Sequence, residues 1–364
     1  MQLIDARDGT HRWSETYDRD TTDILSLQRE IATGVARELQ ISVSDYFGPG
    51  STTKSAEAYD LYLRGIRDVD TYNGEAVLRA IAAFSKAVED DPAYVNAWVG
   101  LATAYDVAAT TGVSPAAEAY RQARLAADKA LDLDPRDADA YAMRAFIRMN
   151  VWDWEGAEDD IRRSLRVRKT SGATQAAAKL ATARGDSSEA ERLLRAVLAL
   201  DPLDTYTLEE LASSVYPALG QFEESDRLYS KLRDLDAGYN WLNTSQAIVK
   251  VLEGNYTLAL QLADSETNVE AKETALATVY SMLGKPDRSQ QALERLLRIP
   301  TVRKYNIAGV YAYRGEKDLA FQYLEAACQQ REPNLLYLKT DPLFTGLRSD
   351  QRYNALLRKM NLPE

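Results

Sequence analysis

The sequence predicts an all-α chain folded as a right-handed superhelix of about eight antiparallel helix pairs. Small and aromatic residues recur at the three- and four-residue spacing of a buried helical stripe. Asp-Pro pairs end several of the units, which repeat at about 34 residues. A chain of 364 residues exceeds one usual core, so a repeat array or several domains are expected.

The clearest unit is the stretch 93–135. Trp98, Leu101, Ala102 and Tyr105 fall on one face of its first helix, and a second helix carries alanines at the same spacing. This pattern resembles the signature of the tetratricopeptide repeat, Trp-x2-Leu-Gly-x2-Tyr followed by Ala-x3-Phe and Pro. The resemblance implies a stack of helix pairs whose concave groove binds a protein or peptide.

Residues 1–47 are expected to form a β-hairpin, with its turn at Asp8-Gly9, and an amphipathic helix over 23–40. The start of the chain resembles the end of the TolB-like α/β domain that precedes such repeats in multidomain bacterial regulators. The resemblance implies a remnant of that domain, with Met1 inside a longer reading frame. The matching residues are Gln2, Leu3, Ile4, Asp5, Ala6, Gly9, Trp13, Ser14, Glu15, Tyr17, Asp18 and Arg19.

The remainder divides into three predicted parts. Residues 48–55 (GPGSTTKS) form a linker without apolar side chains, and 56–332 form the repeat array. Forty-three residues separate two repeat-ending prolines, which favours a long loop at 110–115. Residues 333–364 are expected to be a helical cap that closes the end of the stack. This tail also resembles that of TolB-like repeat proteins.

Composition argues against several classes of function. The chain has 44 Lys and Arg against 55 Asp and Glu, which disfavours nucleic-acid and polybasic membrane partners. One cysteine, Cys328, and one histidine, His11, exclude an internal disulfide and a Cys- and His-rich zinc site. Cys328 is expected to be a small core residue. With no signal peptide and no apolar run of membrane-spanning length, the chain is expected to be cytoplasmic.

The search for catalytic chemistry predicts a protein that is not an enzyme and has no cofactor or metal. The glycines at 48–50 lack a preceding strand, and no nucleophile elbow occurs. Paired carboxylates such as Asp159 and Asp160 are expected on solvated helix faces. Trp154 is expected to pack at an inter-helix turn, and Trp152 to be partly exposed.

The concave groove is the remaining candidate site. In a stack of helix pairs the first helix of each pair lines the groove. A polar groove suits an extended peptide, with Phe146 and Tyr216 as apolar anchors. Lys179 stands alone, which puts a clamp for a C-terminal carboxylate in doubt, and ordinary solvated surface is the alternative for each position. The candidates are Asn96, Thr103, Asp106, Phe146, Gln175, Lys179, Thr182, Glu209, Ser213, Tyr216, Asn243 and Lys250, with Met149 beside Phe146.

Two functional hypotheses follow. The first is a non-catalytic scaffold that binds a protein or peptide segment in the groove, with self-association through the N-terminal hairpin as a further mode. The alternative is the sensory or regulatory arm of a transcription factor or nucleotide cyclase, with its effector domain upstream of Met1. Neither hypothesis identifies the partner.

Overall fold

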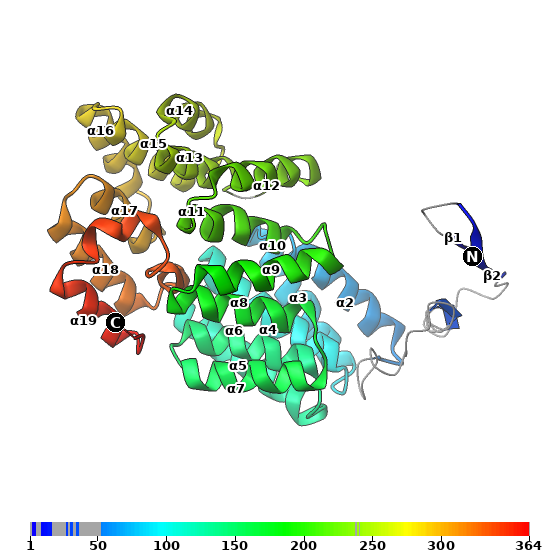
Figure 1. Cartoon of the computed structure of the whole chain (residues 1–364). Coiled ribbons are helices and arrows are strands. Elements are labelled where there is room, and N and C mark those ends of the chain that lie inside the picture. The colour runs from blue at the N-terminus through cyan, green and yellow to red at the C-terminus, as the bar shows by residue number, and fades with distance from the viewer. Residues whose placement is uncertain are drawn as a thin grey trace.

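A computed structural model describes residues 2–4, 9–16, 27, 30–31, 34–35, 52–236, 239 and 241–363. These residues form a short antiparallel hairpin, eight consecutive helix pairs and a C-terminal tail (Figure 1). The all-α superhelix of about eight pairs that the sequence predicts is therefore confirmed.

The first four pairs have continuous helices. They are α2 (Ala56–Val69) with α3 (Gly74–Asp90), α4 (Val95–Thr111) with α5 (Ala116–Leu133), α6 (Ala138–Asn150) with α7 (Trp154–Val167), and α8 (Ser171–Arg184) with α9 (Ser187–Leu200).

The fifth pair is irregular. Its first helix is divided into α10 (Thr205–Glu210), the π-helical segment η3 (Leu211–Val215) and α11 (Tyr216–Ala218), and it packs on α12 (Phe222–Leu235). The last three pairs are shorter. They are α13 (Leu242–Glu253) with α14 (Tyr256–Ser265), α15 (Val269–Met282) with α16 (Pro286–Leu297), and α17 (Lys304–Tyr313) with α18 (Lys317–Gln330). The tail contains η4 (Pro333–Tyr337), η5 (Pro342–Leu347) and α19 (Gln351–Lys359).

The predicted hairpin is present at the N-terminus. Strand β1 (Gln2–Ile4) pairs with β2 (His11–Ser14), and the hairpin stands apart from the helices in Figure 1. Of the helix predicted over 23–40, the described residues 27, 30, 31, 34 and 35 are helical. The rest of that helix, residues 48–51 of the linker, and Asp5, Ala6, Tyr17, Asp18 and Arg19 of the TolB-like match lie outside the described residues.

Close packing between the first two pairs depends on glycines that face Phe84. The Phe84 side chain is fully buried. A Cβ at Gly65 would lie 2.6 Å from its ring, and a Cβ at Gly100 would lie 2.4 Å from it. Both distances are too short for a real contact, so these two positions require residues without side chains.

The repeat-ending Asp-Pro pairs share one local structure. The carboxylates of Asp91, Asp134 and Asp201 each accept the backbone N–H two residues further on, at 3.1, 2.9 and 3.0 Å. Proline lacks the N–H that would continue the helix. The aspartate turn and the proline together end each second helix at the same point in its repeat.

The long loop predicted at 110–115 is wrong. Helix α4 continues to Thr111 and α5 begins at Ala116, and these helices have 17 and 18 residues against 14 each in α8 and α9. The hydroxyls of Thr110 and Thr111 donate to carbonyls four residues earlier, which keeps both threonines within the helix. The extra residues of this repeat therefore lengthen its helices.

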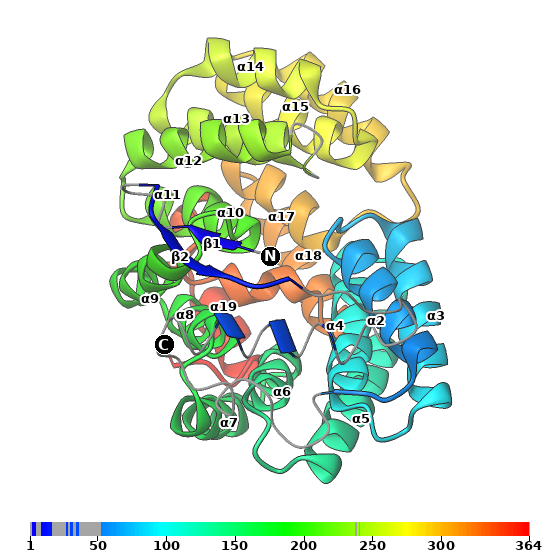
Figure 2. The ribbon, with the colours of Figure 1, turned by 90° about the vertical axis from the view of Figure 1, so that its right-hand side faces the viewer.

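The tail closes the superhelix. In Figure 2 helices α2 to α16 run round in a ring, and the orange and red C-terminal elements lie across its far side. Trp154 donates from Nε1 to the Met360 carbonyl at 2.6 Å, so Trp154 is buried as predicted. Arg331 donates to the Val151 carbonyl at 2.7 Å, and its guanidinium lies 4.8 Å from the Trp152 ring. Trp152 is thereby buried, which corrects the expectation of partial exposure.

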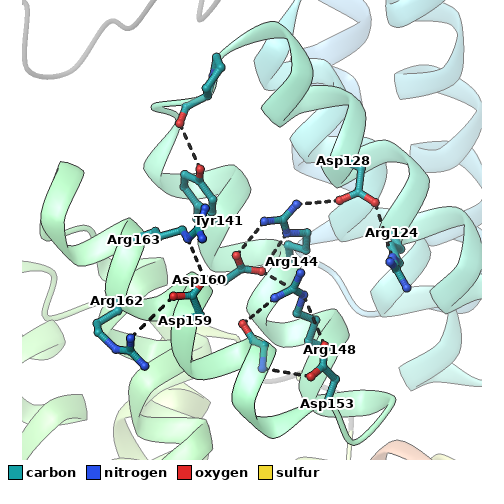
Figure 3. A network of polar contacts seen from close by, with 12 residues as sticks. Arg124, Asp128, Tyr141, Arg144, Arg148, Asp153, Asp159, Asp160, Arg162 and Arg163 are labelled. Atoms are coloured by element: carbon teal, nitrogen blue, oxygen red, sulfur yellow. Dashed lines mark hydrogen bonds and ion pairs between the residues drawn. The ribbon is translucent and has the colours of Figure 1, made fainter.

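The expectation for Asp160 is also wrong. Its carboxylate is fully buried and accepts two bonds of 2.8 Å from Arg144, with Arg148 3.2 Å away (Figure 3). Arg144 also bonds Asp128 at 2.8 Å, so the cluster joins α5, α6 and α7. Asp159, its sequence neighbour, is exposed as expected.

Cys328 lies in the core, as predicted. Burial raises the pKa of its thiol to about 12.

Candidate functional site

The concave side of the superhelix encloses a cavity of about 1100 Å³. Its walls come from the first helices α4, α6, α8 and α10, from the loop between α2 and α3, and from segments that precede α13, α15 and α17. The tail segment η4 completes the lining with Leu336 and Tyr337. Early and late repeats therefore meet around one space.

Seven of the twelve groove candidates line this cavity. They come from four successive first helices, as the stacking argument expects. They are Thr103, Asp106, Phe146, Gln175, Lys179, Glu209 and Ser213.

The other five candidates lie outside the lining. Thr182 and Tyr216 are buried at 1% and 5% exposure, and Lys250 is buried and paired with Asp226 and Glu253. Asn243 accepts a bond from Arg233 at 3.1 Å, and Asn96 is half-buried. Met149 is fully buried.

Tyr216 is displaced by a local irregularity of its helix. Glu209 and Tyr216 are seven residues apart and would share a face of a regular α-helix. Between them lies η3, where the Tyr216 N–H donates to the carbonyl of Leu211, five residues earlier, and not to the residue four earlier as in an α-helix. The extra residue turns Tyr216 by about 100°. Its ring packs instead in a core cluster that includes Leu194.

Thr182 illustrates a second reason why some groove candidates lie outside the cavity lining. Nine of the fourteen residues of α8 are buried, because this helix contacts α6, α9 and the tail. A Cβ at Gly185 would lie 3.3 Å from Lys339 Cε, which shows how closely the tail approaches the end of α8. Counting from one buried stripe does not identify the exposed face of such a helix.

A buried polar triad forms part of the cavity wall. Lys179 Nζ lies 3.0 Å from Glu210 Oε2, and the side chains are 10% and 2% exposed. The Tyr337 hydroxyl accepts a bond from Lys179 and donates to the same Glu210 oxygen at 2.7 Å. The second oxygen, Oε1, is buried and has no hydrogen-bond partner among the described residues.

Two further carboxylates face this triad. Asn150 donates from Nδ2 to Asp106 at 2.9 Å. Burial raises the pKa of Asp106 to about 6, although the Asn150 bond and the charge of Lys179 act in the opposite direction. Burial and the adjacent Glu210 charge raise the pKa of Glu209 to about 7, while a bond to Ser213 and the charge of Lys179 lower it. Both carboxyl groups are therefore poised to change charge near neutral pH.

Aromatic rings line the same cavity as these carboxylates. Tyr206 lies edge-on to Phe146, with ring centroids 6.5 Å apart. Burial raises the pKa of Tyr206 and of Tyr72, and both phenols also feel the charges of Asp106 and Glu209. Tyr72 belongs to the first repeat and Tyr206 to the fifth, so closure of the superhelix brings them together.

The lining residues that sequence reasoning missed include Tyr72, Tyr206, Glu210 and Tyr337. Tyr206 had a usable signal, because it lies three residues before Glu209 and so shares its helix face. Tyr72 and Tyr337 lie outside the α-helices, where helical spacing carries no information.

No group of His, Cys, Asp and Glu side chains within the described ranges is arranged to hold a metal ion. None of the helices described is both long and apolar enough to cross a membrane.

Comparison with known proteins places the fold. The chain is similar in structure to the APC/C hetero-tetramer Cut9–Hcn1, with a TM-score of 0.53 and 16% identity over 83% of this chain and 54% of that one. A tetratricopeptide repeat protein from Parabacteroides merdae gives a TM-score of 0.46 at 14% identity, over 73% of this chain and 99% of the other.

In sequence, 105 residues are 29% identical to putative adenylate cyclase 3 of Rhizobium meliloti. This match spans 28% of the chain and 18% of the length of that relative. No family model matches the chain. The eight stacked helix pairs and the similarity to Cut9–Hcn1 show that the chain has the tetratricopeptide-repeat fold.

Proposed function

We propose that the chain is a non-catalytic protein-interaction module whose central cavity binds an extended segment of a partner protein. The observation that carries the proposal is the cavity itself, built from first helices of at least four repeats and from the tail. At about 1100 Å³ it exceeds the usual 300–1,000 Å³ of small-molecule pockets, so it has room for several peptide residues.

The lining suits a polypeptide. Ser213, Ser214 and Asn334 offer hydroxyl and amide groups that can pair with backbone N–H and C=O groups. Aromatic rings alternate with these polar groups and supply anchoring surface for side chains.

Selection from a library of random dodecapeptides tests this proposal. Thr103 lines the cavity and is half-buried, so the larger side chain in Thr103→Trp should fill part of the space. The affinity for the selected peptides should then fall at least tenfold. Leu200→Trp is the matched control, because Leu200 is 74% exposed and lies outside the lining. Selected peptides that bind both variants like the unaltered chain would refute the cavity as the site.

A second candidate rests on the similarity to putative adenylate cyclase 3. In this proposal the superhelix is the regulatory region of a larger protein, and partner binding in the cavity controls an effector domain encoded upstream. Sequencing the DNA before the codon for Met1 tests it. An open frame encoding a cyclase or DNA-binding domain supports the candidate, whereas an in-frame stop codon and a ribosome-binding site contradict it.

A further inference from the structure

We infer that the cavity binds a basic partner segment by taking the cationic side chain of an arginine or lysine between carboxylates and tyrosine rings. The carboxylates are those of Asp106, Glu209 and Glu210. The inference rests on the proposed function, because it presumes that a polypeptide occupies the cavity. It adds the chemistry of the residue that is recognised.

The first argument is charge. Seven carboxylates line the cavity, against two cations, Lys179 and Arg303. Lys179 is already engaged by Glu210, and Arg303 donates to the Thr110 carbonyl and to Asn334. Among the described residues, Glu209 and Asp106 have no ion-pair partner within 4 Å. A segment that brings a cation completes this set, and an acidic segment would be repelled.

The second argument is hydrogen bonding. Two side-chain atoms in the lining are buried and unpartnered within the described residues, Glu210 Oε1 and Asn150 Oδ1. Both are acceptors, and both residues are more than nine-tenths buried. Asn150 uses its Nδ2 to donate to Asp106, and its oxygen is left without a partner among the described residues. Guanidinium and ammonium groups are donors only, so they match what the cavity lacks.

The third argument is the aromatic wall. Lys179 Nζ lies 4.0 Å from the centroid of the Tyr337 ring and 5.9 Å from that of Tyr206. The protein thus already holds one of its own cations beside these two rings, hydrogen-bonded to the Tyr337 hydroxyl. Tyr72 and Tyr239 bring two more phenol rings to the same charges. Aromatic faces beside carboxylates are the usual surroundings of a bound organic cation.

Two aromatic residues of this wall have an unusual backbone conformation. Tyr72 and Trp241 both line the cavity and both have positive φ, 50° and 64°. Bulky residues rarely adopt this conformation, and strain of this kind concentrates at binding sites. It is imposed here on two aromatic side chains that face the same space.

A second, smaller pocket argues for a polypeptide over a free amine. It has a volume of about 200 Å³, and it shares Tyr337 and Trp241 with the main cavity. Ile248, Leu252 and Val310 make part of its wall apolar. A segment with an apolar residue next to its cation can fill both spaces, whereas a small polyamine has nothing to place in the second.

The test begins with the composition of selected peptides. Dodecapeptides chosen by the unaltered chain and displaced by Thr103→Trp should be enriched at least threefold in Arg and Lys over the starting library. Cavity-bound peptides without this enrichment would overturn the cationic inference and leave the proposed function standing. Absence of any cavity-dependent peptide would overturn both.

Variants of the chain then connect the cation to its carboxylates. Glu209→Gln should lower the affinity for the best basic peptide about tenfold. The double variant Asp106→Asn with Glu209→Gln should lower it about a hundredfold. Neither variant should lose the helical circular-dichroism signal. Glu223→Gln is the matched control, because Glu223 is exposed on α12 and lies outside the lining. Equal affinity in all three variants would overturn the inference.

Spermidine separates the two sources of a cation. If a partner segment is the occupant, spermidine should compete at least a hundredfold more weakly than the selected peptide. Competition at the peptide's own concentration would show that charge alone is recognised, and would overturn the assignment to a basic segment.

Discussion

Asp160 and Glu210 are both almost completely buried carboxylates of the same superhelix, but their surroundings differ. Both oxygens of Asp160 accept hydrogen bonds from Arg144, and one also pairs with Arg148, in a cluster that connects three helices. Glu210 receives Lys179 and Tyr337 on one oxygen, and the other is unpartnered in the described residues. The first arrangement uses all the acceptors of the carboxylate and stabilises the fold, whereas the second leaves one buried acceptor without a donor.

The largest expected effect comes from breaking the complete cluster. Asp160→Ala leaves Arg144 and Arg148 with fewer partners in a mostly buried setting, so the free energy of unfolding should fall by about 3–5 kcal/mol. Urea denaturation measures this loss. Asp159→Ala is the matched control: Asp159 is 41% exposed, and its ion pair should contribute less than about 1 kcal/mol. Equal losses would contradict the assignment of Asp160 as the structural carboxylate.

The incomplete site should respond less strongly. Lys179→Met removes the cation from Glu210, at an expected cost of about 2–3 kcal/mol, because Tyr337 still donates a hydrogen bond to Glu210. Adding Glu210→Gln should restore most of that stability. A double variant as unstable as the single one would show that Lys179 acts through packing and not through charge.

A third expected effect is on pH dependence. The folded-state pKa values of Glu209, about 7, and Asp106, about 6, lie above the ordinary carboxyl values of 4.5 and 3.8. The folded chain therefore holds more protons than the unfolded one between about pH 4 and 7. The two carboxyl groups therefore contribute most to the free energy of unfolding below pH 4. About 2 kcal/mol of that contribution is lost as pH rises through 7, after allowance for solvent screening.

Binding of a basic peptide should show the opposite trend. Ionised carboxylates attract a cation, so affinity should rise about tenfold from pH 6 to 8. Titration calorimetry at several pH values measures it, and a flat profile would contradict the role of these two groups. The groups that interact electrostatically or by hydrogen bonds with Glu209 are Glu210, Ser213, Lys179 and the phenols of Tyr72, Tyr206, Tyr229, Tyr239 and Tyr337. Those that interact with Asp106 are Asn150, Lys179 and the phenols of Tyr72, Tyr120 and Tyr206.

The smallest expected effect is on stability at the ligand-facing carboxylate. Glu209→Gln removes a charge that repels Glu210 and breaks no ion pair described in the structure. The free energy of unfolding at pH 7 should change by less than about 0.5 kcal/mol or rise slightly. Thermal unfolding beside Glu223→Gln measures this. A loss comparable to that of Asp160→Ala would mean that both carboxylates are structural.

Much of the fold could be predicted from local sequence. Phe84 with its facing glycines and the Asp-Pro turns act within one repeat or between neighbours, and helical spacing reveals such contacts. Seven cavity residues were found in the same way. Local spacing carries this information because each repeat packs mainly on the next.

The rest of the site depends on features that spacing does not report. Lys179 and Tyr337 are 158 residues apart, and they meet because the tail returns to the middle of the array. Tyr216 turns into the core because a π-helical segment shifts the register. Pro217, which cannot bond back to Ser213, was the one sequence sign of that irregularity.

The central claim is that the carboxylates of Asp106 and Glu209 have no cation of the chain paired with them among the described residues, and that a partner segment supplies one. The most direct measurement is the affinity of the best selected arginine peptide and of its citrulline analogue, which keeps the shape of the side chain and removes the charge. The unaltered chain should bind the arginine peptide at least tenfold more tightly than the citrulline analogue. In the double variant Asp106→Asn with Glu209→Gln, this difference in affinity should be less than threefold. Equal binding of the two peptides to the unaltered chain, or a preference that persists in the variant, would contradict the account.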